Sequence, residues 1–186
     1  ASGLQALLAQ TGGDSFLINQ MITICAEQMK QAGWTRLTDR RVAEAAAAFL
    51  QDDTHWAVIE SLRQIEINPS LLSCALLLLE RGEAPDGELP VDSGESPTAL
   101  DLCGAFGRTA VGYKLKSTLW ATMVRRHLTP ARVGGLYAIA GDWARAIQYL
   151  GLAVRAGETA VKPELFAATI NAIHAHRGAQ AFEALR

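Results

Sequence analysis

The chain contains few of the residues that favour β-strands. Aromatic residues make up only 6% of its 186 residues, and alanine and leucine dominate instead. Alanine and leucine are strong helix formers, whereas strands are enriched in aromatic and β-branched residues. The composition therefore predicts a mainly α-helical protein with at most a short β hairpin.

Cysteine is also scarce, and its positions exclude the common metal and disulfide frameworks. The three residues Cys25, Cys74 and Cys103 lie far apart, with no CxxC and no Cys/His ligand spacing. Structural metal sites and disulfide scaffolds need paired or closely spaced ligands. We expect three reduced core residues, no bound metal and no cofactor.

The sequence has no excess of positive charge. Its formal net charge of -2 gives no overall attraction to a phosphate backbone. One basic group stands near an expected helix end, where cations complement the helix dipole, and consists of Arg125, Arg126, His127 and Arg132. A nucleic-acid partner is therefore not expected.

Long apolar runs are missing as well. The longest run, residues 71–79, contains a serine and a cysteine and is too short to cross a bilayer. No N-terminal signal pattern is present. The sequence thus predicts a cytoplasmic protein without a membrane partner, and its start at Ala1-Ser2-Gly3 suggests a segment of a longer protein.

No group of residues has the pattern of a catalytic centre. The phosphate-binding motif GxxxxGK[ST] is absent. Asp52 and Asp53 beside His55 lie between two expected helices, where helix capping is favoured over acid–base chemistry. His174 and His176 are two positions apart on an expected helix and cannot share a face as an i,i+4 metal pair does. No enzyme activity is predicted.

Glycine and proline divide the chain into helical stretches. Residues 82–97 are rich in Gly, Pro, Asp, Glu and Ser and are expected to form a mobile loop. Residues 109–115, with alternating apolar side chains, are the one expected β element. Beyond residue 130 we expect helices over 131–140, 143–156 and 163–174, and a further one over 180–185 after Gly178.

The region from residue 130 onward is similar to the tetratricopeptide repeat. In that repeat, small residues let two antiparallel helices approach and large residues fill the gap between repeats. Pro130 stands in place of the usual aromatic residue, and Glu158 in place of the closing proline. A generic αα-hairpin stays open as the alternative. The six matching positions are Gly134, Tyr137, Gly141, Ala146, Leu150 and Ala153.

Residues 11–29, TGGDSFLINQMITICAEQM, and residues 38–62 resemble the helical part of AAA-like ATPases of the STAND signalling type. In that family a Thr-Gly-Gly-x-Pro-x-Leu turn opens the helical subdomain. The resemblance implies a nucleotide-proximal turn at Thr11, Gly12, Gly13 and Ser15. Ser15 occupies the position of the family's proline, which is expected to press on bound nucleotide.

Residues 71–85 and 99–124 look like the winged-helix domain that follows in such proteins. The resemblance implies a helical subdomain over 1–66, a winged-helix-like domain over 67–128 and tetratricopeptide-like hairpins over 129–186. It further implies a P-loop upstream of Ala1 and output domains downstream of Arg186. The implied partners are the protein's own nucleotide-binding core and other proteins.

Two functions follow from these patterns. The first is a non-catalytic regulatory and protein-interaction segment of a nucleotide-switched signalling protein. The second is a winged-helix transcriptional regulator with residues 97–103 as recognition helix and Arg108, Lys114 and Lys116 on phosphates. Against the second, the recognition helix offers Thr98 and Asp101 but no side chain typical of base-edge recognition. We expect its surface around Leu100, Leu102 and Phe106 to pack on protein instead, either within this chain or against the missing nucleotide-binding core.

Overall fold

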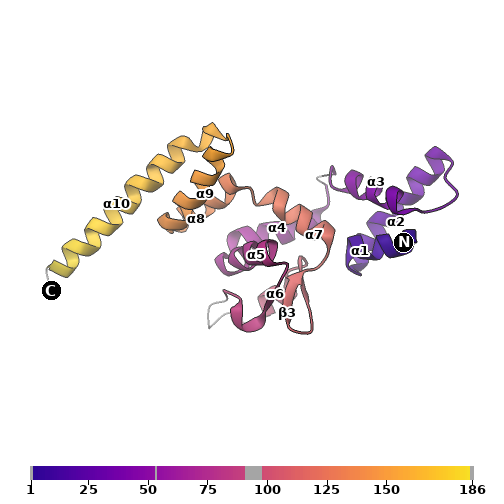
Figure 1. Ribbon diagram of the computed structural model, residues 1–186, viewed down its shortest axis with the longest axis horizontal. Coiled ribbons are helices and arrows are strands. Elements are labelled where there is room, and N and C mark those ends of the chain that lie inside the picture. Colours follow the sequence, from indigo (N-terminus) through magenta and orange to yellow (C-terminus); the bar gives the residue numbers. More distant parts are fainter. Residues whose placement is uncertain (1, 53, 91–97, 185–186) are drawn as a thin grey trace. The chain divides into compact units, whose positions relative to one another are not determined.

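The computed structural model describes residues 2–52, 54–90 and 98–184. These residues form ten α-helices, two short 3-10 helices and one antiparallel sheet of three short strands (Figure 1). The prediction of a mainly helical fold is confirmed. The chain divides into two compact units, Ala1–Arg125 and Arg126–Arg186, and each is described by itself.

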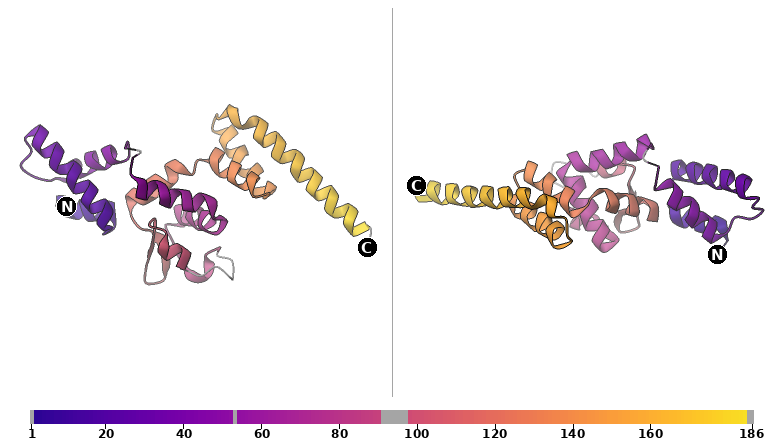
Figure 2. Two further views of the ribbon diagram at one scale, coloured as in Figure 1. Left: turned by 180° about the vertical axis from the view of Figure 1, so that it is seen from behind. Right: turned by 90° about the horizontal axis from the view of Figure 1, so that it is seen from above.

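Three helices form the first lobe of the N-terminal unit: α1 (Gly3–Thr11), α2 (Ser15–Ala32) and α3 (Asp39–Phe49), which pack on one another (Figure 2). A capping box begins α1, because Ser2 Oγ accepts from the Gln5 backbone N–H and Gln5 Oε1 accepts from the Ser2 backbone N–H. The side chains that fill the core of this lobe include Leu7, Leu17, Met21, Val42 and Phe49.

Helices α4 (Trp56–Ile67) and α5 (Pro69–Arg81) begin the second lobe of the N-terminal unit. Asn68 separates them and caps α5, because its Oδ1 accepts from the backbone N–H groups of Ser70 and Leu71. No single helix among the described residues is both long and apolar enough to cross a membrane. Within the described part of the chain, one pair of helices, α4 with α5, meets that test jointly, across a bend of 106°.

The rest of the second lobe consists of α6 (Thr98–Leu102), α7 (Thr118–His127) and the sheet. Its strands β1 (Glu83–Pro85), β2 (Phe106–Arg108) and β3 (Gly112–Leu115) run antiparallel in the order β1-β3-β2. Glu83 pairs with Lys114 on one side of β3, and Phe106 pairs with Leu115 on the other. Gly112 is required here, because a Cβ on it would lie 2.1 Å from the Ala84 carbonyl oxygen.

The prediction of a mobile loop over residues 82–97 is wrong for its first part. Residues 83–85 form β1 and Asp86–Glu88 form the 3-10 helix η1. Pairing with β3 uses backbone groups and needs only one inward side chain, Ala84, which is fully buried. A strand of three residues is too short to show alternation in the sequence. Residues 91–97 lie outside the described part of the chain.

The C-terminal unit contains α8 (Pro130–Ile139), α9 (Trp143–Arg155), the 3-10 helix η2 (Thr159–Val161) and α10 (Lys162–Ala184). Residues 163–174 and 180–185 were expected as two helices with a break at Gly178, but α10 runs on through that position. An isolated glycine costs a helix only about 1 kcal/mol relative to alanine, and no proline follows it.

The six repeat-like positions all belong to the α8–α9 hairpin. Five of them are buried, and Gly141 lies exposed in the turn with a φ of 77°. The ring of Tyr137 stacks on Tyr149 with 5.7 Å between centroids. Gly134 lets the two helices approach, since a Cβ there would lie 2.6 Å from Leu150 Cγ.

All three cysteines are free and buried, as expected for core residues. Burial raises the pKa of the Cys74 thiol to about 11 and also raises the pKa values of Cys25 and Cys103. Thiols with raised pKa values hold little thiolate at neutral pH and react slowly. These side chains therefore contribute packing rather than chemistry.

We predict that Gly134→Ala destabilises the α8–α9 hairpin by about 1–3 kcal/mol, because the added methyl group collides with Leu150. The matched control is Gly135→Ala on the same helix, where a Cβ meets nothing within 4 Å. That change should be neutral or stabilising by up to about 1 kcal/mol. Hydrogen exchange of the α8 and α9 amides measures both, and equal protection in the two variants would contradict the packing role of Gly134.

Candidate functional site

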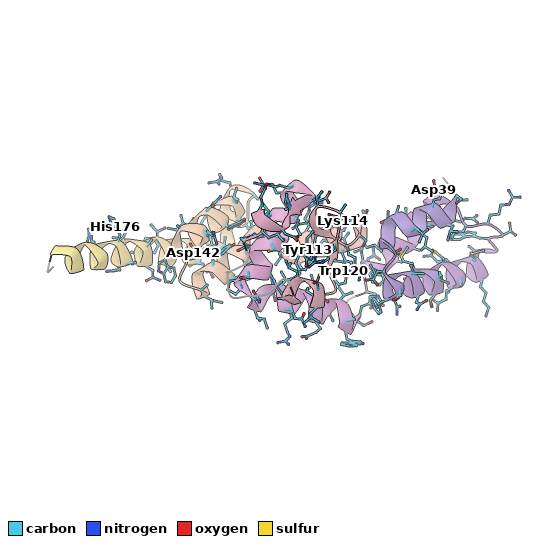
Figure 3. All side chains as sticks on the ribbon, turned by 90° about the horizontal axis from the view of Figure 1, so that it is seen from below. Asp39, Tyr113, Lys114, Trp120, Asp142 and His176 are labelled. Atoms are coloured by element: carbon cyan, nitrogen blue, oxygen red, sulfur yellow. The ribbon has the colours of Figure 1, made fainter. Side chains whose placement is uncertain are left out.

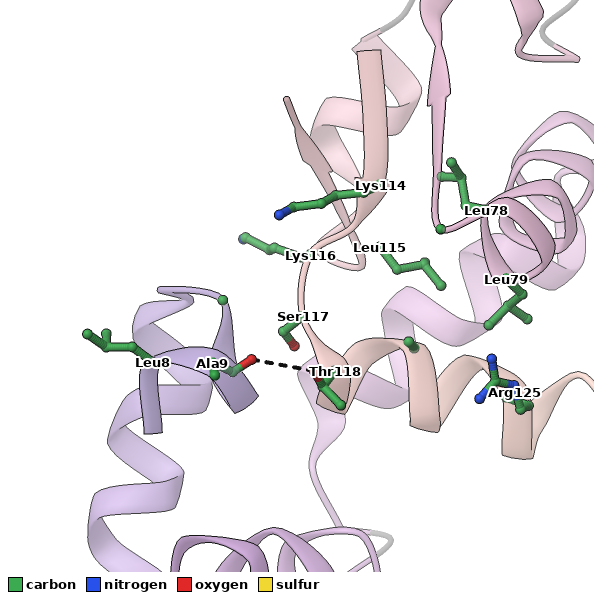
Figure 4. Close-up of a pocket in the computed structure, with 13 residues that line it drawn as sticks. Leu8, Ala9, Leu78, Leu79, Lys114, Leu115, Lys116, Ser117, Thr118 and Arg125 are labelled. Atoms are coloured by element: carbon green, nitrogen blue, oxygen red, sulfur yellow. Dashed lines mark hydrogen bonds between the residues drawn. The ribbon is translucent and has the colours of Figure 1, made fainter. Parts of the chain in front are cut away.

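A groove of about 480 Å³ lies where the two lobes of the N-terminal unit meet, and we call it the junction groove (Figure 4). Helix α1 lines it with Leu8, Ala9 and Gly12, and the end of α5 lines it with Leu78 and Leu79. The remaining wall is formed by Gly82, by residues 114–118, and by Ala121 and Arg125 from one face of α7. Both lobes thus contribute backbone and side chains to one site.

The Thr11-Gly12-Gly13 turn forms one rim of this groove. Gly12 adopts a φ of 60° and ends α1, with its N–H donating to the Leu8 carbonyl oxygen at 2.8 Å. A Cβ on Gly12 would lie 2.0 Å from the Lys116 carbonyl oxygen, whereas a Cβ on Gly13 would meet nothing within 4 Å. Gly12 therefore has two structural reasons to be glycine, its left-handed conformation and the close approach of the second lobe.

The neighbouring residue of the turn, Thr11, is fully buried. Its Oγ1 donates to the Leu7 carbonyl oxygen at 2.9 Å, within the turn of helix that precedes it. Ser15, the first residue of α2, is exposed. Of the four residues expected near nucleotide, Gly12 lines the groove, and Thr11 points its hydroxyl back into its own helix.

Asp14 connects the start of α2 to the second lobe. Its Oδ1 accepts from the Leu17 backbone N–H at 3.0 Å, which caps α2, and its Oδ2 lies 2.9 Å from Lys116 Nζ. Burial by itself raises the pKa of the Asp14 carboxyl. The hydrogen bonds from Leu17 and Lys116 and the charge of Lys116 outweigh burial and lower that pKa below its usual value. The carboxylate is thus ionised at neutral pH.

A further polar contact joins the lobes at the first turn of α7. Thr118 Oγ1 donates to the Ala9 carbonyl oxygen at 3.5 Å (Figure 4). The preceding residue, Ser117, caps α7, because its Oγ accepts from the Trp120 backbone N–H at 3.1 Å. The contacts described between the lobes here are polar or backbone contacts, not an apolar core.

Asp52 has a different role from the helix cap that was expected. Asp52 Oδ1 accepts from both the backbone N–H and the hydroxyl of Thr54, at 2.9 and 2.6 Å. The hydrogen bond from the Thr54 hydroxyl, and after it the one from the Thr54 backbone N–H, lowers the pKa of the Asp52 carboxyl below its usual value. Because the carboxylate bonds to this local turn, it does not cap α4, whose N-cap residue, His55, has no side-chain cap bond. Asp53 lies outside the described residues.

His55 lies in the connection between the lobes, among aromatic rings. Its ring stacks on Phe49 with centroids 4.3 Å apart and meets Phe16 edge-on at 6.2 Å. Its Nε2 lies 3.6 Å from Asp52 Oδ2. Stacking on Phe49 makes His55 part of the packing between α3 and α4 rather than part of an open site.

A second charged cluster holds the β2–β3 hairpin to α6. Arg108 donates from Nε and a terminal nitrogen to the two oxygens of Asp101, at 3.1 and 3.3 Å. Tyr113, which is labelled in Figure 3, donates from its Oη to Asp101 at 2.8 Å. The Arg108 guanidinium also covers the Tyr113 ring at 4.9 Å. Burial, together with the bond to Asp101, raises the pKa of Tyr113 to about 12. Arg108 is therefore already engaged by a carboxylate.

The surface expected to face DNA or protein is only partly exposed. Leu100 and Phe106 are buried in the second lobe, whereas Leu102 is 78% exposed. Helix α6 spans five residues, little more than one turn. Two of the three residues expected to contact protein thus pack within their own lobe.

The basic and histidine residues singled out from the sequence are dispersed. Arg125 lines the junction groove, Arg126 and His127 end α7, and Arg132 lies in the first turn of α8. His174 and His176 are exposed on α10. In the described parts of the chain, no group of three or more His, Cys, Asp or Glu side chains is arranged to hold a metal ion.

The junction groove itself was not expected from the sequence. Asp14 and Lys116 are far apart along the chain, and nothing local to either residue indicates the other. One sequence signal for the groove existed: the i, i+3 and i+7 spacing places Thr118, Ala121 and Arg125 on one face of a helix. No protein-family model, curated protein or solved structure matches the chain significantly.

We predict that Gly12→Ala lowers the free energy of unfolding of the N-terminal unit more than Gly13→Ala, by about 1–3 kcal/mol. Both glycines have positive φ, so the backbone strain of alanine is common to the two variants. Only the Gly12 methyl group collides with the Lys116 carbonyl. Urea unfolding followed by tryptophan fluorescence gives the difference, with all variants carrying Trp143→Phe so that the signal comes from the N-terminal unit. Equal losses would show that the lobes do not depend on this approach.

Proposed function

We propose that this chain is a non-catalytic regulatory and protein-interaction segment of a larger, nucleotide-switched signal-transduction protein of the STAND type. In this proposal, residues 1–66 are a helical subdomain, residues 67–128 a winged-helix-like domain and residues 129–186 tetratricopeptide-like hairpins. The segment acts in the cytoplasm, on the protein's own nucleotide-binding core and on other proteins. It binds no cofactor of its own.

The observation that carries the proposal is the polar contact between the two lobes at the Gly12 turn. An ion pair, a hydrogen bond and one close backbone approach connect helices that each pack mainly within their own lobe. Small polar interfaces rearrange more readily than apolar cores, and hinge or shear motions use such contacts. This arrangement suits a segment that relays a change of state between neighbouring domains.

The order of elements in the second lobe also supports the proposal. Helix α5, helix α6, strand β3 with Tyr113, and helix α7 follow one another in the order that the winged-helix resemblance implies. The glycine spacing of the α8–α9 hairpin supports the repeat-like part in the same way. These likenesses concern the order and spacing of elements. They therefore support the proposed domain types directly and the proposed function only through them.

Exposed apolar side chains favour protein partners. On α10 they recur at i, i+4 and i+7, as Phe166, Ile170 and Ile173, with Phe166 69% exposed. Trp56 on α4 is 75% exposed. Contiguous apolar side chains on a surface are typical of interaction sites.

We predict that nucleotide chemistry lies outside this chain. Isothermal titration of magnesium-ATP into the protein should give no measurable binding, because the Gly12 turn is covered by Lys116 and no phosphate-binding loop is present. The complete coding sequence should contain GxxxxGK[ST] upstream of these residues. Micromolar ATP affinity of this chain, or a complete reading frame without that motif, would contradict the proposal.

The alternative, a winged-helix transcriptional regulator, predicts binding to duplex DNA. We expect no saturable sub-micromolar binding to random-sequence duplex at about 0.15 M salt. The physical reason is that Arg108 is already paired with Asp101 and that α6 offers no base-reading side chain. Fluorescence anisotropy measures this. Sub-micromolar binding that Arg108→Glu with Lys114→Glu abolishes would favour the regulator instead.

A further inference from the structure

The junction groove carries positive charge that the protein does not neutralise. Lys114, Lys116 and Arg125 line it. The Lys116 side chain pairs with Asp14, whereas neither the Lys114 nor the Arg125 side chain forms an ion pair or hydrogen bond with another described residue. Since the whole chain has a net charge of -2, this concentration of cations is local.

Among the described residues, carboxylates lie near two of these cations, Lys116 and Lys114. Asp14 is engaged by Lys116, and Glu83 stands opposite Lys114 in the β1–β3 pair without an ion pair between them. The described residues that line the groove include no carboxylate. The groove wall is therefore positive, and Glu83, opposite Lys114 in the sheet, is placed to weaken the charge there.

The same groove has an apolar floor. Leu8, Leu78, Leu79 and Leu115 line it, and Leu8 is 47% exposed. In the close-up, Lys114 and Lys116 project to the same side of the β3 end, and Arg125 lies farther along α7 beside Leu79 (Figure 4). A ligand that fits combines negative groups with apolar groups.

The lining argues for a peptide over a nucleotide or a nucleic acid. Bases bind single-strand sites by stacking on aromatic rings, and no described lining residue is aromatic. A carboxylate is a good partner for lysine and arginine, and leucine side chains bury well against leucine. Complementary charge also steers such a segment toward the groove.

We propose that the junction groove binds a short acidic segment of a partner protein, with carboxylates on Lys114 and Arg125 and separate apolar side chains on Leu8 and on Leu79. This inference rests on the proposed protein-interaction function and names the chemistry of one partner. The ligand contacts both lobes, so its binding favours the arrangement in which they are docked.

Selection from a phage-displayed library of random peptides tests the proposal. The protein should enrich peptides that combine Asp or Glu with Leu or Ile. The variant Lys114→Glu with Arg125→Glu should not. The matched control is Lys30→Glu with Arg155→Glu, which makes the same change of net charge at exposed residues outside the groove and should select the same peptides as the unchanged protein.

Fluorescence anisotropy with the enriched peptide then gives the size of the effect. Lys114→Glu with Arg125→Glu should weaken binding about tenfold or more, and the Lys30 and Arg155 control should leave it nearly unchanged. Glu83→Gln should strengthen binding about twofold to fivefold, because it removes the carboxylate opposite Lys114. A gain of affinity cannot arise from misfolding, so this variant keeps the test decisive if the charge reversals unfold the protein.

Three results would overturn the inference: no enrichment of acidic peptides, equal binding by the groove variant and its control, or tighter binding to duplex DNA or phosphatidylserine vesicles than to any selected peptide. Such a failure leaves the proposed function intact if the coding sequence contains the P-loop and this chain binds no ATP. Conversely, ATP binding by this chain would contradict the proposed function without affecting the peptide measurement.

Discussion

The arrangement of the N-terminal unit depends on the approach of the Gly12 turn to the Lys116 backbone. No other residue fits at Gly12 without moving the second lobe, because a Cβ would overlap the Lys116 carbonyl oxygen. The side chain of Lys116 then reaches Asp14, whose carboxylate also caps α2. One short stretch of chain thereby couples the start of a helix, the end of another and the contact between lobes.

The same physical device recurs elsewhere in the chain. Gly112 lets β1 approach β3, and Gly134 lets α9 approach α8. In each case the glycine matters for what faces its missing side chain, not for flexibility. Gly13 and Gly135 show the contrast, because a Cβ on either would meet nothing within 4 Å.

The distribution of paired and unpaired cations has functional consequences. Arg108 is held by two hydrogen bonds to Asp101 and covers Tyr113, so its charge serves the hairpin. Lys114 projects from the neighbouring strand beside an apolar groove and forms no ion pair with a described residue. A cation that already pairs with a carboxylate of the protein adds little to the binding of a negative ligand. A solvated cation beside apolar surface can still form an ion pair with such a ligand. Negative partners are therefore expected at Lys114 and not at Arg108.

Local signals predicted most of the helices. The cap at Asn68 with Pro69, the glycine at the end of α2 and the Gly141-Asp142 turn each act within a few residues of the helix end that they define. The spacing of Gly134, Ala146 and Leu150 placed the side chains of a hairpin on facing sides, because helical periodicity is itself local. Where short-range propensity was ambiguous, the prediction was wrong: the helix break expected at Gly178 and the loop expected over residues 83–88 are not present.

The sequence by itself determined the helical character of the chain, the burial of its cysteines and the absence of a phosphate-binding loop motif. Only the tertiary structure decided that Lys116 meets Asp14, that Arg108 meets Asp101 and that three cations share one groove. Helices are stabilised by interactions between residues three or four positions apart, and these spacings can be recognised in the sequence itself. Contacts between distant residues depend on how the lobes pack, and no local pattern encodes them.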